Sequence, residues 1–294
     1  MSPPALVLNF DAAAGELPGA SVIALESWQE RIRFGCSWRQ FRQLAQHLKP
    51  QLPERYGCVF TGSGDYHHLS YFLLSQLPAG QPVQVIICDN HPDNMRYPFG
   101  IHCGSWVYWA SRLPQVAEIH VVGISSGDIG LRHAWENHWS PLCNGKLTYW
   151  SVNQPASWTR LAGGRPGGRN FPDAGALLTA LFDHTGHLPV YLSIDKDVLS
   201  PEVVSTNWDQ GTFVTRDLLA LITRCAGMLI GADITGDVSL WRYQHWFKRW
   251  LSAADGQSSP SGAQIREWQR RQHELNRHLL QAIERAWAIA PYHV

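Results

Sequence analysis

Short apolar segments alternate along most of the chain with longer segments that carry apolar residues at helical spacing. An almost wholly apolar run such as 83–88 is typical of a strand buried on both faces of a parallel sheet. The short segments predict strands at 5–10, 58–61, 83–88, 116–122, 147–151, 190–194 and 228–234. The longer ones predict helices at 38–48, 69–77, 105–112, 129–139, 173–184 and 215–225. This alternation favours an α/β fold with a mainly parallel sheet covered by helices on both faces.

Two stretches interrupt the alternation. Residues 153–172 are rich in Gly, Pro and Arg and are predicted to form an exposed loop or lid. Residues 255–262 separate an aromatic helix, expected at about 239–254, from a final amphipathic helix that packs on the domain or on a second subunit. The apolar positions of the final helix are Ile265, Trp268, Leu275, Leu279, Ile283 and Ala286. We therefore expect one α/β domain over 1–294, with a C-terminal helical extension at about 239–290.

Composition narrows the class of protein. Lys plus Arg and Asp plus Glu both number 24, so no global basic field is available to hold nucleic acid or an anionic membrane. The chain lacks a basic, then apolar leader and any apolar run near the roughly 20 residues that span a bilayer. The six cysteines are scattered and are expected to be reduced thiols. These features predict a cytoplasmic protein with no nucleic-acid or membrane partner.

Fourteen tryptophans are an unusual number for 294 residues. Most are expected to pack in the core, whereas the cluster of Trp241, Trp246 and Trp250 is compatible with a pocket wall or a subunit interface.

Two short runs combine acidic and imidazole side chains at every second position. They are Asp89-Asn90-His91-Pro92-Asp93 and Ser193-Ile194-Asp195-Lys196-Asp197. Each run ends a predicted strand, and in extended chain residues two apart point the same way, so the ligand-type side chains of each run converge. Four carboxylates gathered in a low-dielectric cleft would repel one another strongly. Divalent cations that neutralise them are the economical explanation.

A third group of ligand-type side chains follows the strand predicted at 58–61. It is the turn Gly62-Ser63-Gly64-Asp65-Tyr66-His67-His68. Ligands collect beyond the carboxyl ends of strands in open parallel sheets, so the three segments are expected to meet. Aspartates with one or two histidines form an oxygen-rich set that suits Mn²⁺ better than a structural zinc site. Two ions sharing a water lower its pKa and present hydroxide to a trigonal carbon, which indicates hydrolysis.

The three motifs, in this order, resemble those of the ureohydrolases, the arginase and agmatinase superfamily. The resemblance covers about 59–237 and includes a Gly-Gly-Asp-His-like turn, the Asp-x-His-x-Asp run, and the Ser-x-Asp-x-Asp run with Pro201 nearby. It implies an arginase-like fold, with three α/β/α layers around a mainly parallel sheet, and two Mn²⁺ ions per chain. Family members are often trimers or hexamers, so a homo-oligomer is also expected.

The resemblance implies a ligand set. Its members are His68, His67, Asp89, His91, Asp93, Asp195 and Asp197. Asp89 and Asp195 would bridge the two ions. Asp93 and one of the adjacent histidines would complete one site, and His91 and Asp197 the other. The choice between the histidines stays open, with His68 preferred as the ligand and His67 as its supporting partner.

The segment Gly100-Ile101-His102-Cys103-Gly104 is similar to a turn that carries a proton-shuttling histidine in this family. The resemblance implies that His102 is a general acid, and that it acts with the bridging Asp89 and Asp195 as the catalytic set. A lone histidine before a helix is otherwise more often a surface or capping residue. Cys88 and Cys103 flank the predicted site but are read as buried apolar thiols rather than nucleophiles.

The chain departs from the family pattern where substrate is recognised. Residues 205–211 replace a Pro-Gly-Thr-Gly-like loop, and Gly236 stands where guanidine-cleaving members place a glutamate. A carboxylate opposite guanidinium forms a strong, often bidentate contact, so its loss argues against classical arginase activity. Asp209 and Asp237 are candidate replacements, and Asn207 joins them in the expected substrate-binding set.

The leading functional hypothesis is a hydrolase with two metal ions, which cleaves a C–N bond of a small amidine, guanidino or amide compound through a metal-bridging hydroxide. One alternative is a deacetylase-like amidohydrolase that uses a single zinc ion. The other is a catalytically decayed family member, in which the metals support the fold and the Trp-rich C-terminal segment binds a partner. The expected partner of the enzyme is a small nitrogenous substrate.

Overall fold

The computed structural model describes residues 3–53, 56–162, 167–186, 188–241, 243–244, 248–249 and 262–289. Nine strands in these residues form one central sheet, in the order β2-β1-β4-β11-β10-β5-β7-β8-β9, and every neighbouring pair is parallel. The strands are β1 (Leu6–Asn9), β2 (Ser21–Ala24), β4 (Cys58–Phe60), β5 (Val83–Cys88), β7 (Val116–Ile124), β8 (Leu147–Val152), β9 (Gly168–Phe171), β10 (Val190–Asp195) and β11 (Leu229–Thr235). A small antiparallel pair joins β3 (Gly35–Cys36) to β6 (Ile101–His102).

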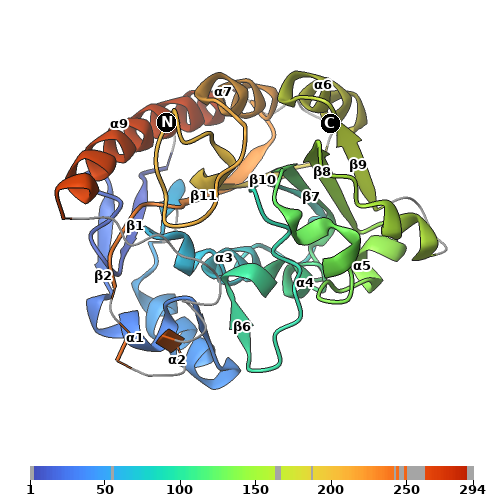
Figure 1. Cartoon of the computed structure of the whole chain (residues 1–294). Helices are drawn as coiled ribbons and strands as arrows, with labels where there is room; N and C mark the ends of the chain where they lie inside the picture. Colours follow the sequence, from blue (N-terminus) through green and yellow to red (C-terminus); the bar gives the residue numbers. More distant parts are fainter. Residues whose placement is uncertain are drawn as a thin grey trace.

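Helices cover both faces of the sheet, as Figure 1 shows. They are α1 (Gln29–Ile32), α2 (Trp38–Leu48), α3 (Leu69–Ser75), α4 (Trp106–Ala110), α5 (Ser140–Cys143), α6 (Ala174–His184), α7 (Thr215–Arg224) and α9 (Gly262–Ala288). Apolar side chains of α2, α3 and α4 form one buried cluster with the sheet, and those of α6, α7 and α9 form another. The three layers confirm the predicted fold class.

Strand β5 shows why its residues form a central strand. Val85 and Ile87 belong to the first apolar cluster, and Ile86 and Cys88 to the second. Successive side chains of a strand point to opposite faces, so an almost wholly apolar run fills both cores at once. All six residues of β5 are buried, and the strand coincides with the predicted range.

Local signals also set the helices. Helix α2 begins at a capping box, in which the Ser37 side chain accepts a hydrogen bond from Gln40 N and the Gln40 side chain accepts one from Ser37 N. Phe41, Leu44 and Leu48 then lie on its buried face. The final amphipathic helix is α9, which packs on α7 and β11, and its predicted apolar residues from Leu275 to Ala286 are buried.

The helix predicted at 129–139 is wrong. This stretch forms the 3-10 turns Gly127–Ile129 and Leu131–His133 and then pairs with the loop after β5 through the bridge between Met95 and Asn137. The buried Asn137 side chain donates to Asp128 O and accepts from the Tyr149 hydroxyl, which favours the irregular path over a helix.

The loop predicted at 153–172 is only partly a loop. It contains β9, which pairs with β8 at the sheet edge, and a 3-10 segment whose Trp158 is buried and donates to Ile129 O. Most of the aromatic helix predicted at about 239–254, with Trp246 and Trp250, lies outside the described residues. Within the part of the chain that is described, no helix has the length and apolar character of a membrane span.

Candidate metal centre

The predicted motifs meet because their strands are neighbours. Strand β10 pairs with β5 on one side and with β11 on the other, and β11 pairs with β4. The parallel strands place their carboxyl ends at one edge of the sheet. The two acidic runs begin at the ends of β5 and β10, and the turn with His67 follows β4. Segments far apart in sequence thus reach one cleft.

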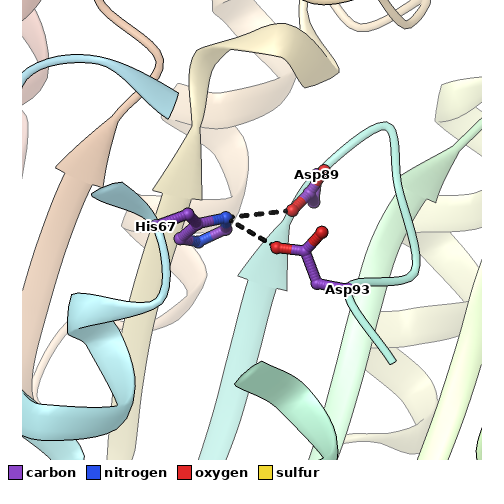
Figure 2. Close-up of side chains that lie close together, drawn as sticks. All are labelled: His67, Asp89 and Asp93. Carbon is purple, nitrogen blue, oxygen red and sulfur yellow. Dashed lines mark ion pairs between the residues drawn. The ribbon is translucent and has the colours of Figure 1, made fainter. Parts of the chain in front are cut away.

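His67 lies at the centre of the first ligand group. Its Nδ1 atom is 2.9 Å from Asp93 Oδ2, 3.2 Å from Asp89 Oδ2 and 3.5 Å from Asp195 Oδ2. Figure 2 shows the imidazole and the Asp89 and Asp93 carboxylates directed at one another. All four side chains are buried. Three of them, His67, Asp89 and Asp93, are close enough to hold one metal ion.

His91 lies at the centre of the second ligand group. Its Nδ1 atom is 3.0 Å from Asp197 Oδ2 and 3.5 Å from Asp89 Oδ1. Asp89, His91 and Asp197 also have ligand atoms close enough for one ion. Asp89 belongs to both groups and turns one oxygen toward each histidine. This sharing matches a carboxylate that bridges two cations.

The donor chemistry fits divalent cations. Asp89 Oδ2 is buried and makes no hydrogen bond within the described residues, although it lies near His67 Nδ1. Buried polar atoms normally have a partner, so this oxygen has a lone pair to offer to an ion. Asp93 is a non-glycine residue with φ of 45°, and such strain is often found at functional sites.

The pKa values of the acidic side chains also fit a site for divalent cations. Burial, and then the nearby Asp89 carboxylate, raise the pKa of Asp93 to about 7 and the pKa of Asp197 to about 7. Burial followed by the Asp197 charge raises the pKa of Asp195 well above its usual value. Without cations the cluster therefore retains protons near neutral pH. Metal binding would displace these protons, because ligands coordinate in their deprotonated forms.

The ring nitrogens that face away from the centre also have partners. His67 Nε2 lies 3.0 Å from Ser193 Oγ, which donates to Asp233 Oδ1 at 2.7 Å. His91 Nε2 lies 2.7 Å from Asp209 Oδ1. A histidine that donates from Nε2 keeps the Nδ1 lone pair for a metal ion. Sequence reasoning missed the roles of Ser193 and Asp233, although Ser193 shares the alternating positions of its motif.

The structure favours His67 over His68, which reverses the preference from sequence. The short turn Gly64–Tyr66 brings His67 into the acidic cluster, whereas His68 is in neither ligand group. Both ring nitrogens of His68 are buried and make no hydrogen bond among the described residues. Burial, with a smaller effect of the His102 charge, lowers the pKa of His68 well below its usual value. The neighbouring ring is that of Phe41, at 6.2 Å between centroids.

A cavity of about 530 Å³ opens on the ligand groups. His102 lines it together with Phe34, Tyr97 and Trp208, whose rings are in contact with one another or with His102, and acidic side chains line it as well. The acidic residues outside the ligand groups are Asp128, Glu136 and Asp209. The cavity is thus large enough for a small organic substrate and presents both flat apolar and acidic surfaces.

The three predicted substrate-binding residues have different positions. Asp209 lines the cavity, but its carboxylate is hydrogen bonded to His91 and to the Asn90 side chain. Asn207 is buried and accepts from Ser239 N at 2.9 Å. Asp237 is buried, pairs with Lys196 and accepts from the Asn276 side chain. Neither Asn207 nor Asp237 lines the cavity, so the geometry does not support a substrate contact for them.

Gly236 has a physical reason to be glycine. Its φ is +87°, and a Cβ atom there would overlap Asp195 Oδ1 and approach Lys196 N. A glutamate at this position would need a different backbone path. The local structure therefore excludes a glutamate at position 236 on this backbone. The acidic residues that line the cavity outside the ligand groups are Asp128, Glu136 and Asp209.

No protein-family model matches the chain. The chain is 27% identical over 249 residues to an uncharacterized protein of Thermotoga maritima, an alignment that covers 83% of this chain and 85% of that protein.

Solved structures show a shared fold. The chain is similar to the proclavaminate amidino hydrolase of Streptomyces clavuligerus, with 16% identity and a TM-score of 0.56 over 97% of this chain and 93% of that one. An arginase of Bacillus subtilis has 12% identity and a TM-score of 0.57, covering 97% and 98% of the two chains. A formimidoylglutamase of Bacillus subtilis has 12% identity and a TM-score of 0.53, covering 99% and 88%. The resemblance to the ureohydrolase superfamily therefore holds at the level of an arginase-like fold.

Proposed function

We propose that this protein is a metal-dependent hydrolase that holds two divalent cations, Mn²⁺ by preference, and cleaves a C–N bond of a small amidine or amide compound. The observation that carries the proposal is the shared carboxylate of Asp89, which turns one oxygen to each of two Asp/His groups. The fold shared with amidino and formimidoyl hydrolases supports the same reaction class.

The residues have separable roles in this proposal. Bound cations would supply Lewis-acid polarisation of the substrate and a water of lowered pKa. His67, Asp93 and Asp195 would hold one ion, and His91 and Asp197 the other, with Asp89 between them. Ser193 and Asp209 would orient the two imidazoles through Nε2. The aromatic side chains of the cavity lining, Phe34, Tyr97 and Trp208, would exclude water from one side of the substrate.

The substrate is proposed to lack a free guanidinium group. Gly236 leaves no carboxylate to pair with that cation, and the bulk of Asp195 prevents one from being placed there on this backbone. A neutral amide needs no such ion pair at the reacting carbon. An amidine, which is itself a cation near neutral pH, would have to pair with another acidic side chain of the cavity, such as Asp128 or Glu136. We expect a panel of small compounds to show turnover of amidines or amides, with arginine and agmatine poor substrates.

Metal stoichiometry tests the first half of the proposal. Elemental analysis and Mn²⁺ titration of the full chain should give two ions. Asp89→Asn should weaken binding of both, because it replaces one of the two shared oxygens by an amide NH₂ group and removes the negative charge that both sites share. Asp183→Asn is a matched control, since Asp183 is exposed on α6. One tightly bound zinc ion would favour the deacetylase-like alternative. A protein that binds no ion, and whose melting is unaffected by Mn²⁺, would contradict the proposal.

Turnover tests the second half. Two bound ions with no reaction across amidine, amide and guanidino compounds would favour the catalytically decayed alternative. Turnover of an amidine or amide that Asp89→Asn abolishes and Asp183→Asn retains would support the enzyme. The predicted cytoplasmic location and homo-oligomeric state stay predictions.

A further inference from the structure

The backbone determines which nitrogen of His102 carries the proton. Gly104 N donates a hydrogen bond to His102 Nδ1 at 2.8 Å, so Nδ1 acts as an acceptor. A neutral imidazole has one donor and one acceptor nitrogen, so the proton is on Nε2. His102 N donates to Ser105 Oγ at 3.0 Å, which completes a capping arrangement at the turn before α4. Protonating Nδ1 would break the bond to Gly104 and leave two donors facing each other.

The turn is built around this bond. A Cβ atom at Gly104 would lie 2.9 Å from His102 Cε1, closer than side chains normally approach. Glycine therefore allows the imidazole to lie directly against the backbone N–H. Aromatic rings also pack against the imidazole. The Phe34 ring is parallel to it, with 5.7 Å between ring centroids, and the Tyr97 ring is edge-on, with 4.3 Å between centroids. These contacts hold the ring in one orientation.

No negative charge among the described residues favours an imidazolium at this position. The titratable groups around the ring are the thiols of Cys36 and Cys103, the phenol of Tyr97 and the imidazole of His68, and the Lys248 ammonium acts on His68. Burial lowers the pKa of His102 to about 3. His67 differs, because burial disfavours its charge but the adjacent Asp89 and Asp93 carboxylates raise its pKa well above the usual value.

We propose that His102 stays neutral and presents its Nε2–H to the substrate as a fixed hydrogen-bond donor, in place of the proton-shuttling role that the sequence predicts. The inference rests on the proposed function of the same cavity, which His102 lines together with His67 and Asp93. The donor would stabilise negative charge that develops on the oxygen or nitrogen of the attacked C=O or C=N group.

The atoms of the hydrolysis reaction balance without a proton from His102. One water supplies both fragments: its oxygen with one hydrogen bonds to the substrate carbon, and its other hydrogen goes to the departing nitrogen as the C–N bond breaks. His102 gains and loses no proton in this account. Its contribution is a preorganised dipole, which costs no reorganisation during the reaction.

Imidazole NMR of the metal-loaded full chain tests the neutral state without needing turnover. Nitrogen–proton correlation spectra, assigned by difference from His102→Gln, should show His102 as the Nε2–H form from pH 5.5 to 8.5. A doubly protonated ring in this range, or the Nδ1–H form, would overturn the proposal. If the Gln variant does not fold, Gly104→Ala serves for assignment, because the added methyl group crowds the ring and shifts its signals.

Kinetics test the donor role. Loss of one such donor typically lowers kcat by about 100- to 1,000-fold, so we expect this loss in His102→Ala. His102→Gln keeps an N–H donor that does not titrate, and should recover at least about tenfold of that loss with the pH profile of the parent enzyme. Equal impairment of both variants, with a change in the acidic limb of the profile, would identify a proton shuttle. Absence of any substrate would count against the proposed function, and the NMR spectra alone would then support or overturn the neutral state of His102.

Discussion

Two clusters of buried charged groups lie side by side at the ends of β10 and β11, and only one of them is balanced. In the metal centre, Asp89, Asp93, Asp195 and Asp197 face two histidines that carry at most two positive charges. Behind it, Lys196 pairs with Asp237 and donates to Asn276 Oδ1 at 2.8 Å, and Asn276 donates to Asp237 Oδ1 at 3.0 Å.

The difference distinguishes a candidate metal site from a structural contact. Lys196 lies between Asp195 and Asp197 in sequence, yet its ammonium is fully buried with Asp237 and does not neutralise the acidic cluster. The structural cluster supplies its own counter-charge from the chain. The candidate metal centre has counter-charge from the chain for at most two of its four carboxylates, which is the state expected of a site whose remaining counter-charge arrives as an ion.

The strongest test breaks the balanced cluster. Lys196→Met should lower the free energy of unfolding by about 3–5 kcal/mol, because Asp237 is left as an unpaired buried charge. Denaturant unfolding of the metal-free proteins measures the effect. The double variant Lys196→Met/Asp237→Leu removes both charges and should recover most of the loss. A single variant as stable as the parent would show that the pair is not a structural element.

The second test supplies the missing charge to the unbalanced cluster. Mn²⁺ at 100 times its dissociation constant should stabilise the chain by about 2.7 kcal/mol for each site that it fills, since it binds the native state alone. Thermal melting with and without the metal measures this, and a chelator should reverse it. Asp89→Asn should abolish the gain, whereas exposed Asp183→Asn should keep it. An equal gain in Asp89→Asn would place the metal elsewhere.

The third test loosens the centre without removing a ligand. Ser193→Ala deprives His67 Nε2 of its partner and should weaken metal affinity about 10- to 100-fold. Isothermal titration with Mn²⁺ measures the affinity. Ser200→Ala is a matched control, because Ser200 lies after the ligand run and is only partly buried. Unchanged affinity in Ser193→Ala would mean that Ser193 does not orient His67.

The smallest expected effect comes from a change of pH without any substitution. Burial, then the Asp89 charge, raise the folded-state pKa of Asp93 and of Asp197 from 3.8 to about 7. The native metal-free chain therefore holds protons that the unfolded chain releases, so its stability should fall as pH rises from about 4 to about 7. The slope is at most about 1.4 kcal/mol per pH unit for each such proton. Unfolding curves across this range measure it, and saturating Mn²⁺ should remove or reverse the fall. A metal-free chain that gains stability over this range would contradict the raised values.

The sequence alone determined the features that depend on neighbouring residues. Apolar runs such as Val83–Cys88 mark strands because alternation of side chains requires both faces to be apolar in a covered sheet. The positions of Asp89 and Asp195 at strand ends follow from the same local pattern. Helix α2 was predictable from its cap and its apolar spacing.

Tertiary structure alone decided the features that depend on distant residues. The path of the turn after β4 places His67, rather than His68, among the acidic side chains. The partners of Asn137 favour the irregular path at 129–139. The segments that follow β10 and β11 approach each other closely. This approach pairs Lys196 with Asp237 and leaves no room for a side chain at Gly236. Local periodicity carries no information on which distant side chains will come into contact. These contacts decide whether a buried charge is neutralised by another side chain, as for Lys196 and Asp237, or is left for an ion to neutralise.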